Sequence, residues 1–321
     1  MKNLFSVVAV LVLIGRFANG SVLIGLNSSE QKEHGSEQKD HAMHGMESSK
    51  EEPEIASLFL LRLASDTSLN PKTGRLPMGM AKIGQWQAMW MGKAFLDYTY
   101  QSGQRGGESV FALNNGMFGV ARQLGSGALM FRSMLSFEPM TVRNRLYPLL
   151  FQTGETAYGK PIVDGQHPHD LFMEVGVHYA YRLSDSIMLQ GYYAPVGGAA
   201  LGPPAFPHRA SAVYLPQATR GHHWQDSTHI ANQVITGAIA YNKFRWELSG
   251  FHGQEPDEDR WDIDAGPIDS FSTRLSFTPN PNWVGQFSIG RLHQPERMHI
   301  TDIRRTTASV QHSRDLGRGE A

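Results

Sequence analysis

The stretch from Leu171 to Leu183, LFMEVGVHYAYRL, alternates strictly between two kinds of side chain. Its odd-numbered positions are all apolar, whereas its even-numbered positions include Glu174, His178 and Arg182. A β-strand turns successive side chains to opposite faces, so this period predicts a strand with one apolar and one largely polar face. We expect the apolar face, the one that carries Leu171, to point outward.

The same period recurs along the chain and predicts ten strands. Short turns at 125–127, 184–186, 242–243 and 280–282 alternate with long connections at 141–170, 197–229, 254–269 and 294–304. Outer-membrane barrels combine short turns at one end with long loops at the other. The expected strands lie near 88–101, 109–123, 128–139, 171–183, 187–196, 230–242, 244–253, 270–278, 283–293 and 305–313.

This alternation of short turns and long connections predicts an all-β fold, an antiparallel up-and-down outer-membrane β-barrel. A soluble sandwich also alternates, but here aromatic residues such as Tyr100, Tyr181 and Trp283 stand at strand ends, as in the interfacial girdles of barrels. No stretch reaches the roughly 18 apolar residues of a spanning helix. The net charge of -1 argues against a nucleic-acid partner, and the absence of cysteine excludes thiolate metal sites.

The two ends of the chain differ from the region of alternation. Residues 1–20 have the charge, apolar core and small residues of a signal peptide, which predicts export to the cell outer membrane. Residues 21–54 are polar and rich in His and Met, and we expect them to be disordered. Residues 55–85 are expected to form a linker or short helix, and 86–313 the barrel. Residues 314–321 depart from the strand pattern and suggest an aberrant or truncated end, so we expect an incompletely closed barrel.

Several loop motifs carry a resemblance to a known family. They are Tyr147–Gln152 (YPLLFQ), Gly159–Asp170 (GKPIVDGQHPHD), Gly221–Ile230 (GHHWQDSTHI) and Phe251–Glu258 (FHGQEPDE). Over residues 56–313 the chain resembles a family of uncharacterised bacterial outer-membrane β-barrel proteins. In layout, with a His/Met tail before a barrel, it is also similar to copper-resistance protein B. These resemblances imply outer-membrane lipid as a partner, insertion by the barrel assembly machinery, and copper as the ion handled.

Histidine and methionine gather in the tail. His41, Met43, His44 and Met46 combine imidazole with thioether donors, and thioethers suit Cu(I) whereas imidazole suits Cu(II) or zinc. The sequence therefore predicts metal capture by the tail, although a solvated linker would have the same composition.

A second group of histidines lies in the long loops. His167, His169, His222 and His223 come from two different loops, which can converge over a barrel mouth. We predict a second, weaker metal site there, whose affinity falls as the pH drops through about 6.5, because imidazole binds metal only when neutral. A network in which histidines bond to carboxylates and backbone carbonyls is the competing interpretation.

The function expected from these patterns is a binding or passive transport role at the outer membrane, with copper or another transition metal handled there. The alternative is a porin-like channel with no metal role. A lipid-modifying enzyme is disfavoured because no serine hydrolase motif is found, so no catalytic residues or required cofactor are expected. Charges of both signs on the predicted inner face indicate either a lumen of weak ion selectivity or a salt-bridged, plugged interior; they are Lys93, Asp97, Arg132, Glu138, Glu174, Arg182, Arg245, Glu247 and Arg274.

Overall fold

A computed structural model describes residues 7–13, 55–74, 76–226, 228–298 and 300–314. Ten of its strands form one antiparallel meander, in which each strand pairs with the next of the ten along the chain. The expected all-β antiparallel architecture is thus confirmed. The strands are β3 (Trp86–Tyr100), β4 (Glu108–Leu124), β5 (Gly127–Leu135), β8 (Phe172–Arg182), β9 (Ile187–Gly197), β10 (Ala231–Tyr241), β11 (Phe244–His252), β12 (Ser270–Phe277), β13 (Trp283–Leu292) and β14 (Ile303–His312).

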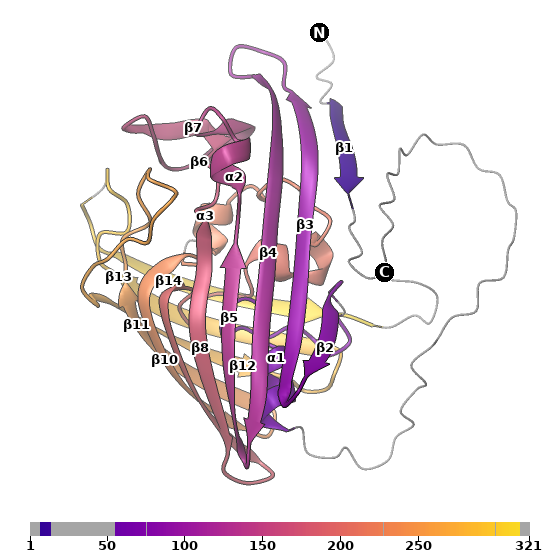
Figure 1. The fold of residues 1–321 in the computed structure, drawn as a ribbon. Coiled ribbons are helices and arrows are strands. Elements are labelled where there is room, and N and C mark those ends of the chain that lie inside the picture. Colours follow the sequence, from indigo (N-terminus) through magenta and orange to yellow (C-terminus); the bar gives the residue numbers. More distant parts are fainter. Residues whose placement is uncertain (1–6, 14–54, 75, 227, 299, 315–321) are drawn as a thin grey trace, which may run out of the picture.

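The sheet curves strongly but is not closed (Figure 1). Among the described strands, β14 pairs with β13 alone, so the free edge expected near residues 305–313 is present. At the other end, β3 pairs along one edge with β1 (Val7–Leu13) and β2 (Gly79–Ile83). The predicted signal peptide overlaps β1, and its other residues lie outside the described part of the chain, as does the predicted tail at 21–54.

Local structure differs from the sequence-based expectation in two places. Residues 55–85, expected to form a linker or short helix, contain the short helix α1 (Ala56–Leu61) but also the strand β2. The strand expected over 128–139 ends at Leu135, and α2 (Glu138–Thr141) follows. Pro139 explains this, because proline cannot donate to a strand ladder but fits the first turn of a helix.

The long connection after α2 holds a small sheet of its own. There β6 (Tyr147–Ala157) pairs antiparallel with β7 (Lys160–Gln166). No helix in the described part of the chain is long and apolar enough to span a membrane.

Apolar side chains occupy the outer face of the curved sheet. In β11, Phe244, Trp246 and Leu248 are exposed, whereas Arg245 and Glu247 between them are buried. The predicted outward face of β8 is confirmed for its second half, where Tyr179 is exposed, but it is wrong for Met173, which is buried. The pairing of β8 with both neighbours shifts register in this first half, and such an irregularity changes the face to which a residue points.

The inner face carries buried ion pairs. Arg132 Nη2 lies 2.8 Å from Glu174 Oε1, and Arg274 Nε lies 2.7 Å from Glu247 Oε2. Arg245 Nη2 is 3.2 Å from the same Glu247 carboxylate. The expected salt-bridged interior is therefore present.

Two residues expected on the inner face do not join these ion pairs. Arg182 pairs with the exposed Asp185 in the turn that follows β8, because it stands at the strand's last position. Glu138 lies in α2 rather than in a strand, because Pro139 beside it disfavours a strand and fits the first turn of a helix.

Chain segments fill the space against the inner face. The helix α1 packs on β4, β5 and β8, and its Ala56 and Leu60 are fully buried. Inner-face arginines hold the segments that follow: Arg132 donates to the Ala64 carbonyl at 3.1 Å, and Arg274 donates to the Gly202 carbonyl at 3.0 Å. We call residues 56–69 and 199–208, which these contacts fix inside the curve, the plug.

Candidate metal centre

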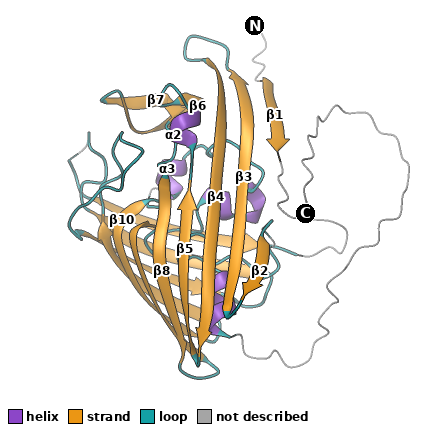
Figure 2. Cartoon of the chain, in the orientation of Figure 1, coloured by secondary structure: helices purple, strands orange, loops and turns teal. Residues whose placement is uncertain are grey.

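The short helix α3 (His222–Gln225), which carries two of the loop histidines, lies at the end of the sheet opposite the short turns (Figure 2). The segment between β7 and β8 supplies His167 and His169. The helix α3 supplies His222 and His223, and His229 stands just before β10. Residues that are distant in the chain thus reach one place because both long loops fold back over the same strand ends.

Five imidazole rings form a continuous cluster. The His222 centroid lies 4.7 Å from that of His229, 5.1 Å from His223 and 6.3 Å from His169. The His167 and His223 centroids are 5.2 Å apart. The predicted convergence of the two loops is therefore present in the structure, although convergence alone does not distinguish a metal site from a hydrogen-bonded network.

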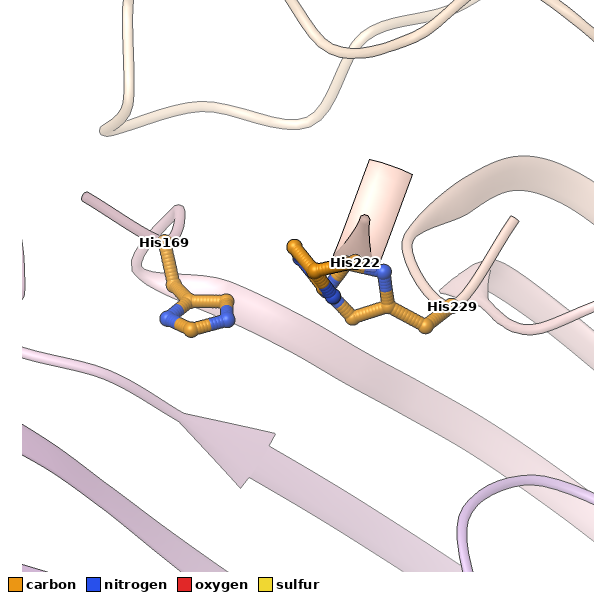
Figure 3. Close-up of side chains that lie close together, drawn as sticks. All are labelled: His169, His222 and His229. Atoms are coloured by element: carbon orange, nitrogen blue, oxygen red, sulfur yellow. The ribbon is translucent and has the colours of Figure 1, made fainter. Parts of the chain in front are cut away.

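One group within this cluster is His169, His222 and His229, which we call the three-histidine cluster (Figure 3). One ring nitrogen of each lies within 4.8 Å of the others. Three imidazoles around one Zn²⁺ at about 2.0–2.1 Å would have nitrogens roughly 3.3 Å apart, so small side-chain shifts would complete such a site. His169 and His222 are buried and His229 is half-buried.

The Nδ1 atoms of this cluster are already engaged. His169 Nδ1 lies 2.9 Å from Glu138 Oε2, and His222 Nδ1 lies 3.4 Å from Asp226 Oδ2. His229 Nδ1 lies 2.6 Å from the backbone carbonyl of Asp226. Metal-binding histidines usually donate one ring N–H to a carboxylate or carbonyl in this way, which leaves the other nitrogen as the ligand.

The Nε2 atoms of His169 and His229 are buried and have no hydrogen-bond partner. A buried polar atom without a partner costs about 1–3 kcal/mol, and native proteins keep few of them. The hydrogen bonds of the described residues leave both atoms unpaired, and a bound cation would satisfy both.

Burial and charge set the protonation of these rings. Burial, together with the neighbouring histidines, holds the pKa of His222 and of His229 well below the usual range. Burial also opposes the charged form of His169, but the adjacent Glu138 outweighs it and raises the pKa of His169. Two of the three rings are thus neutral at neutral pH, as metal ligation requires.

A second group, Glu155, His167 and His223, adjoins the three-histidine cluster. His167 Nε2 lies 2.8 Å from Glu155 Oε1, and one ligand atom from each of the three residues lies within 4.8 Å of the others. However, Arg260 Nη2 is 2.9 Å from the same carboxylate, and Arg260 also pairs with Asp170. Because a guanidinium already neutralises Glu155, this group is the poorer cation site.

The predicted site residues are therefore divided. His169 and His222 belong to the three-histidine cluster, whereas His167 and His223 belong to the second group. Elsewhere, His252 Nδ1 bonds to Asp269 and the Pro267 carbonyl. The predicted tail ligands His41, Met43, His44 and Met46 lie outside the described residues.

Sequence reasoning missed the contributions of His229, Glu138 and Asp226 to this site. His229 lies within the motif Gly221–Ile230 but is not among the predicted ligands, and Glu138 is predicted to lie on the inner face of a strand. Loops have no period from which to read which side chains converge, so no sequence signal marked these three. The end of β5 at Leu135, four residues before Pro139, is what frees Glu138 to lie in α2 beside the loops.

Searches with this chain found no matching family model, no matching curated protein and no matching solved structure.

Proposed function

We propose that this chain is an outer-membrane β-barrel protein that binds a transition-metal ion, copper or zinc, at its three-histidine cluster. The observation that carries the metal assignment is the pair of buried, unpartnered Nε2 atoms on His169 and His229, whose Nδ1 atoms are held by Glu138 and by the Asp226 carbonyl. Imidazole is the commonest protein ligand for such ions.

The distribution of side chains over the sheet supports a membrane setting. Large apolar residues such as Phe131, Leu248, Phe271 and Phe287 stand exposed on the outer face of consecutive parts of the meander. A soluble protein rarely exposes so extended an apolar surface, whereas a barrel turns such a band to lipid and keeps its polar residues inside. The inner ion pairs, including that between Arg132 and Glu174, fit this inverted arrangement.

Copper is favoured within this proposal by the resemblance in layout to copper-resistance protein B. The tail would then capture the ion through His41, Met43, His44 and Met46, and the loops would hold it at the mouth of the barrel. Outer-membrane lipid and the barrel assembly machinery are the partners expected of such a protein.

The structure gives the porin-like alternative little support. The plug lies against the inner face, where Arg132 and Arg274 hold it through its backbone carbonyls. We expect the purified protein to show no steady conductance in planar bilayers. Stable single-channel steps would instead favour the porin-like function.

A metal titration tests the proposal. Detergent-solubilised protein is titrated with Cu(II) and with Zn(II) and compared with a His169→Gln variant and a His252→Gln control. The control removes a loop histidine that also pairs with a carboxylate, Asp269, but lies outside both groups. The proposal predicts that His169→Gln loses the loop site and that His252→Gln keeps it. Equal binding by all three proteins would refute it.

A further inference from the structure

A small cavity that shares His229 with the three-histidine cluster is lined by Met134 of β5, Met173 of β8 and His208. Asp66 and Glu174 also line it, but Glu174 already pairs with Arg132, and Asp66 already accepts hydrogen bonds from Tyr192 and the Gly198 N–H. Both methionines and His208 are buried. The cavity has about 10 Å³ of room, space for about one water-sized sphere and hence for a single ion.

His208 makes an unusual contact at this cavity. Its Nε2 lies 3.1 Å from the Sδ of Met134, and its Nδ1 is buried without a hydrogen-bond partner. A thioether is only a weak hydrogen-bond acceptor, so the contact with Met134 stabilises the Nε2–H of His208 only slightly. The buried Nδ1 of the same ring has no hydrogen bond at all, so burying this ring costs free energy. Two ligands bound at about 2.0–2.3 Å to one ion would lie roughly 3.1–3.8 Å apart, which includes the observed separation.

The chemistry of these donors selects among ions. Thioethers are soft ligands that favour Cu(I), whereas Zn²⁺ and Cu(II) take imidazole and carboxylate readily. Burial lowers the pKa of His208 to about 3, with Lys93 and Arg132 contributing, so its ring is neutral and able to ligate. A pair of thioethers beside a neutral imidazole is thus a donor set for a soft monovalent cation.

We propose that Met134, Met173 and His208 form a second metal site, selective for Cu(I), inside the curve of the sheet. His229 lines the same cavity and belongs to the three-histidine cluster, so the two sites adjoin through one residue. The inference rests on the proposed metal function, but its ligands Met134 and Met173 are absent from the three-histidine cluster, so either site can fail alone.

The test compares Cu(I) affinities by competition with a chromogenic Cu(I) chelator under anaerobic conditions. All proteins are the full chain carrying Met43→Leu and Met46→Leu, so that the tail thioethers do not contribute. We expect Met134→Leu and Met173→Leu each to lower the affinity for one of the bound Cu(I) ions by at least about tenfold. Losses of this size are found when a metal site loses a supporting group. Met130→Leu is the matched control, because Met130 is buried on the same face of β5.

Zn(II) titration of the same proteins separates this inference from the proposed function. Zn(II) binding should be unchanged by Met134→Leu and lost in His169→Gln. If the parent binds no Zn(II) but Met134→Leu still weakens Cu(I) binding, the thioether site is supported and the three-histidine site is refuted. If Met134→Leu and Met173→Leu bind Cu(I) as Met130→Leu does, the thioether site does not exist.

A spectroscopic measurement covers the case in which a variant fails to fold. The protein measured carries only the tail substitutions Met43→Leu and Met46→Leu. X-ray absorption of Cu(I) bound to it should show sulfur in the first coordination shell. A shell of nitrogen and oxygen alone would overturn the proposal.

Discussion

Two buried polar networks in this molecule differ in how completely their atoms are paired. On the inner face of the sheet, Glu247 faces both Arg245 and Arg274, and Arg274 also donates to the plug. In the loops, Nδ1 of each histidine in the three-histidine cluster is engaged, but Nε2 of His169 and His229 is not. The ion pairs of the first network satisfy one another, whereas the second leaves ring nitrogens that a bound cation would satisfy.

The comparison teaches that burial alone does not identify a binding site. A buried charge needs partners, and a network that satisfies all of them stabilises the fold. A network that leaves particular atoms unpaired stores a free-energy cost, which a ligand can remove on binding. Removing a residue should therefore destabilise the fold in the inner-face network and weaken metal binding in the loop network.

The largest expected effect is on stability. Glu247→Gln would leave Arg245 and Arg274 buried without their carboxylate, and breaking a buried pair in this way costs about 3–5 kcal/mol. The free energy of unfolding in detergent, followed by tryptophan fluorescence, measures it. Asp185→Asn is the control, because it breaks the exposed pair with Arg182 and should have no measurable effect. Equal stability of the two variants would contradict the assignment of the inner network to structure.

The next effect is on metal affinity. His169→Gln removes one of three ligands, and we expect the affinity for Zn(II) or Cu(II) at the loops to fall at least about 100-fold, beyond the loss seen for supporting residues. The same variant removes a buried nitrogen that lacks a partner but also the Nδ1 contact with Glu138, so we expect a smaller loss of stability than in Glu247→Gln. Calorimetric titration and unfolding of one preparation give both values. A loss of stability as large as that in Glu247→Gln would mean that His169 belongs to a structural network instead.

The sequence predicted the strands far better than it predicted the site. Alternation in stretches such as Phe244–His252 is a regular signal, because a strand with lipid or solvent on one side and polar packing on the other must repeat every two residues. The loops have no such period. It was therefore possible to expect that His169 and His222 converge, but not that His229 would join them while His167 pairs with Glu155. Met173 lies on the opposite face from the one predicted because the pairing of β8 shifts register there. The alternation of apolar and polar residues does not reveal such a shift, so the sequence could not predict it.

A smaller effect is expected from the residue that orients His169. Glu138→Gln keeps the size of the side chain but removes the charge that faces His169 Nδ1, and we expect a loss of metal affinity of about tenfold, at the lower end for such supporting residues. Asp269→Asn, which changes the carboxylate on His252 in the same way, is the matched control and should bind metal as the parent does. If both variants bind alike, Glu138 does not act through the metal ligand.

The pH dependence of metal binding is the finest of these tests. Because a proton competes with the metal for each ring nitrogen, affinity falls once the pH drops below a ligand's pKa. The pKa of His169 is raised, whereas those of His222 and His229 are held well below 6.5. The loss should therefore begin above pH 6.5, earlier than ordinary imidazole values predict, and should involve one proton, about tenfold per pH unit. Steeper competition by three protons at pH 6.5 would show that the cluster is solvated and not held as described.

Anomalous diffraction tests the central claim most directly. Crystals of the protein grown with Zn(II) and measured at the zinc absorption edge should show one strong peak bounded by Nε2 of His169, His222 and His229, at about 2.0–2.1 Å from each. Their Nδ1 atoms should remain on Glu138 and Asp226. A map with no peak among these three rings, whether or not zinc binds elsewhere, would contradict the account.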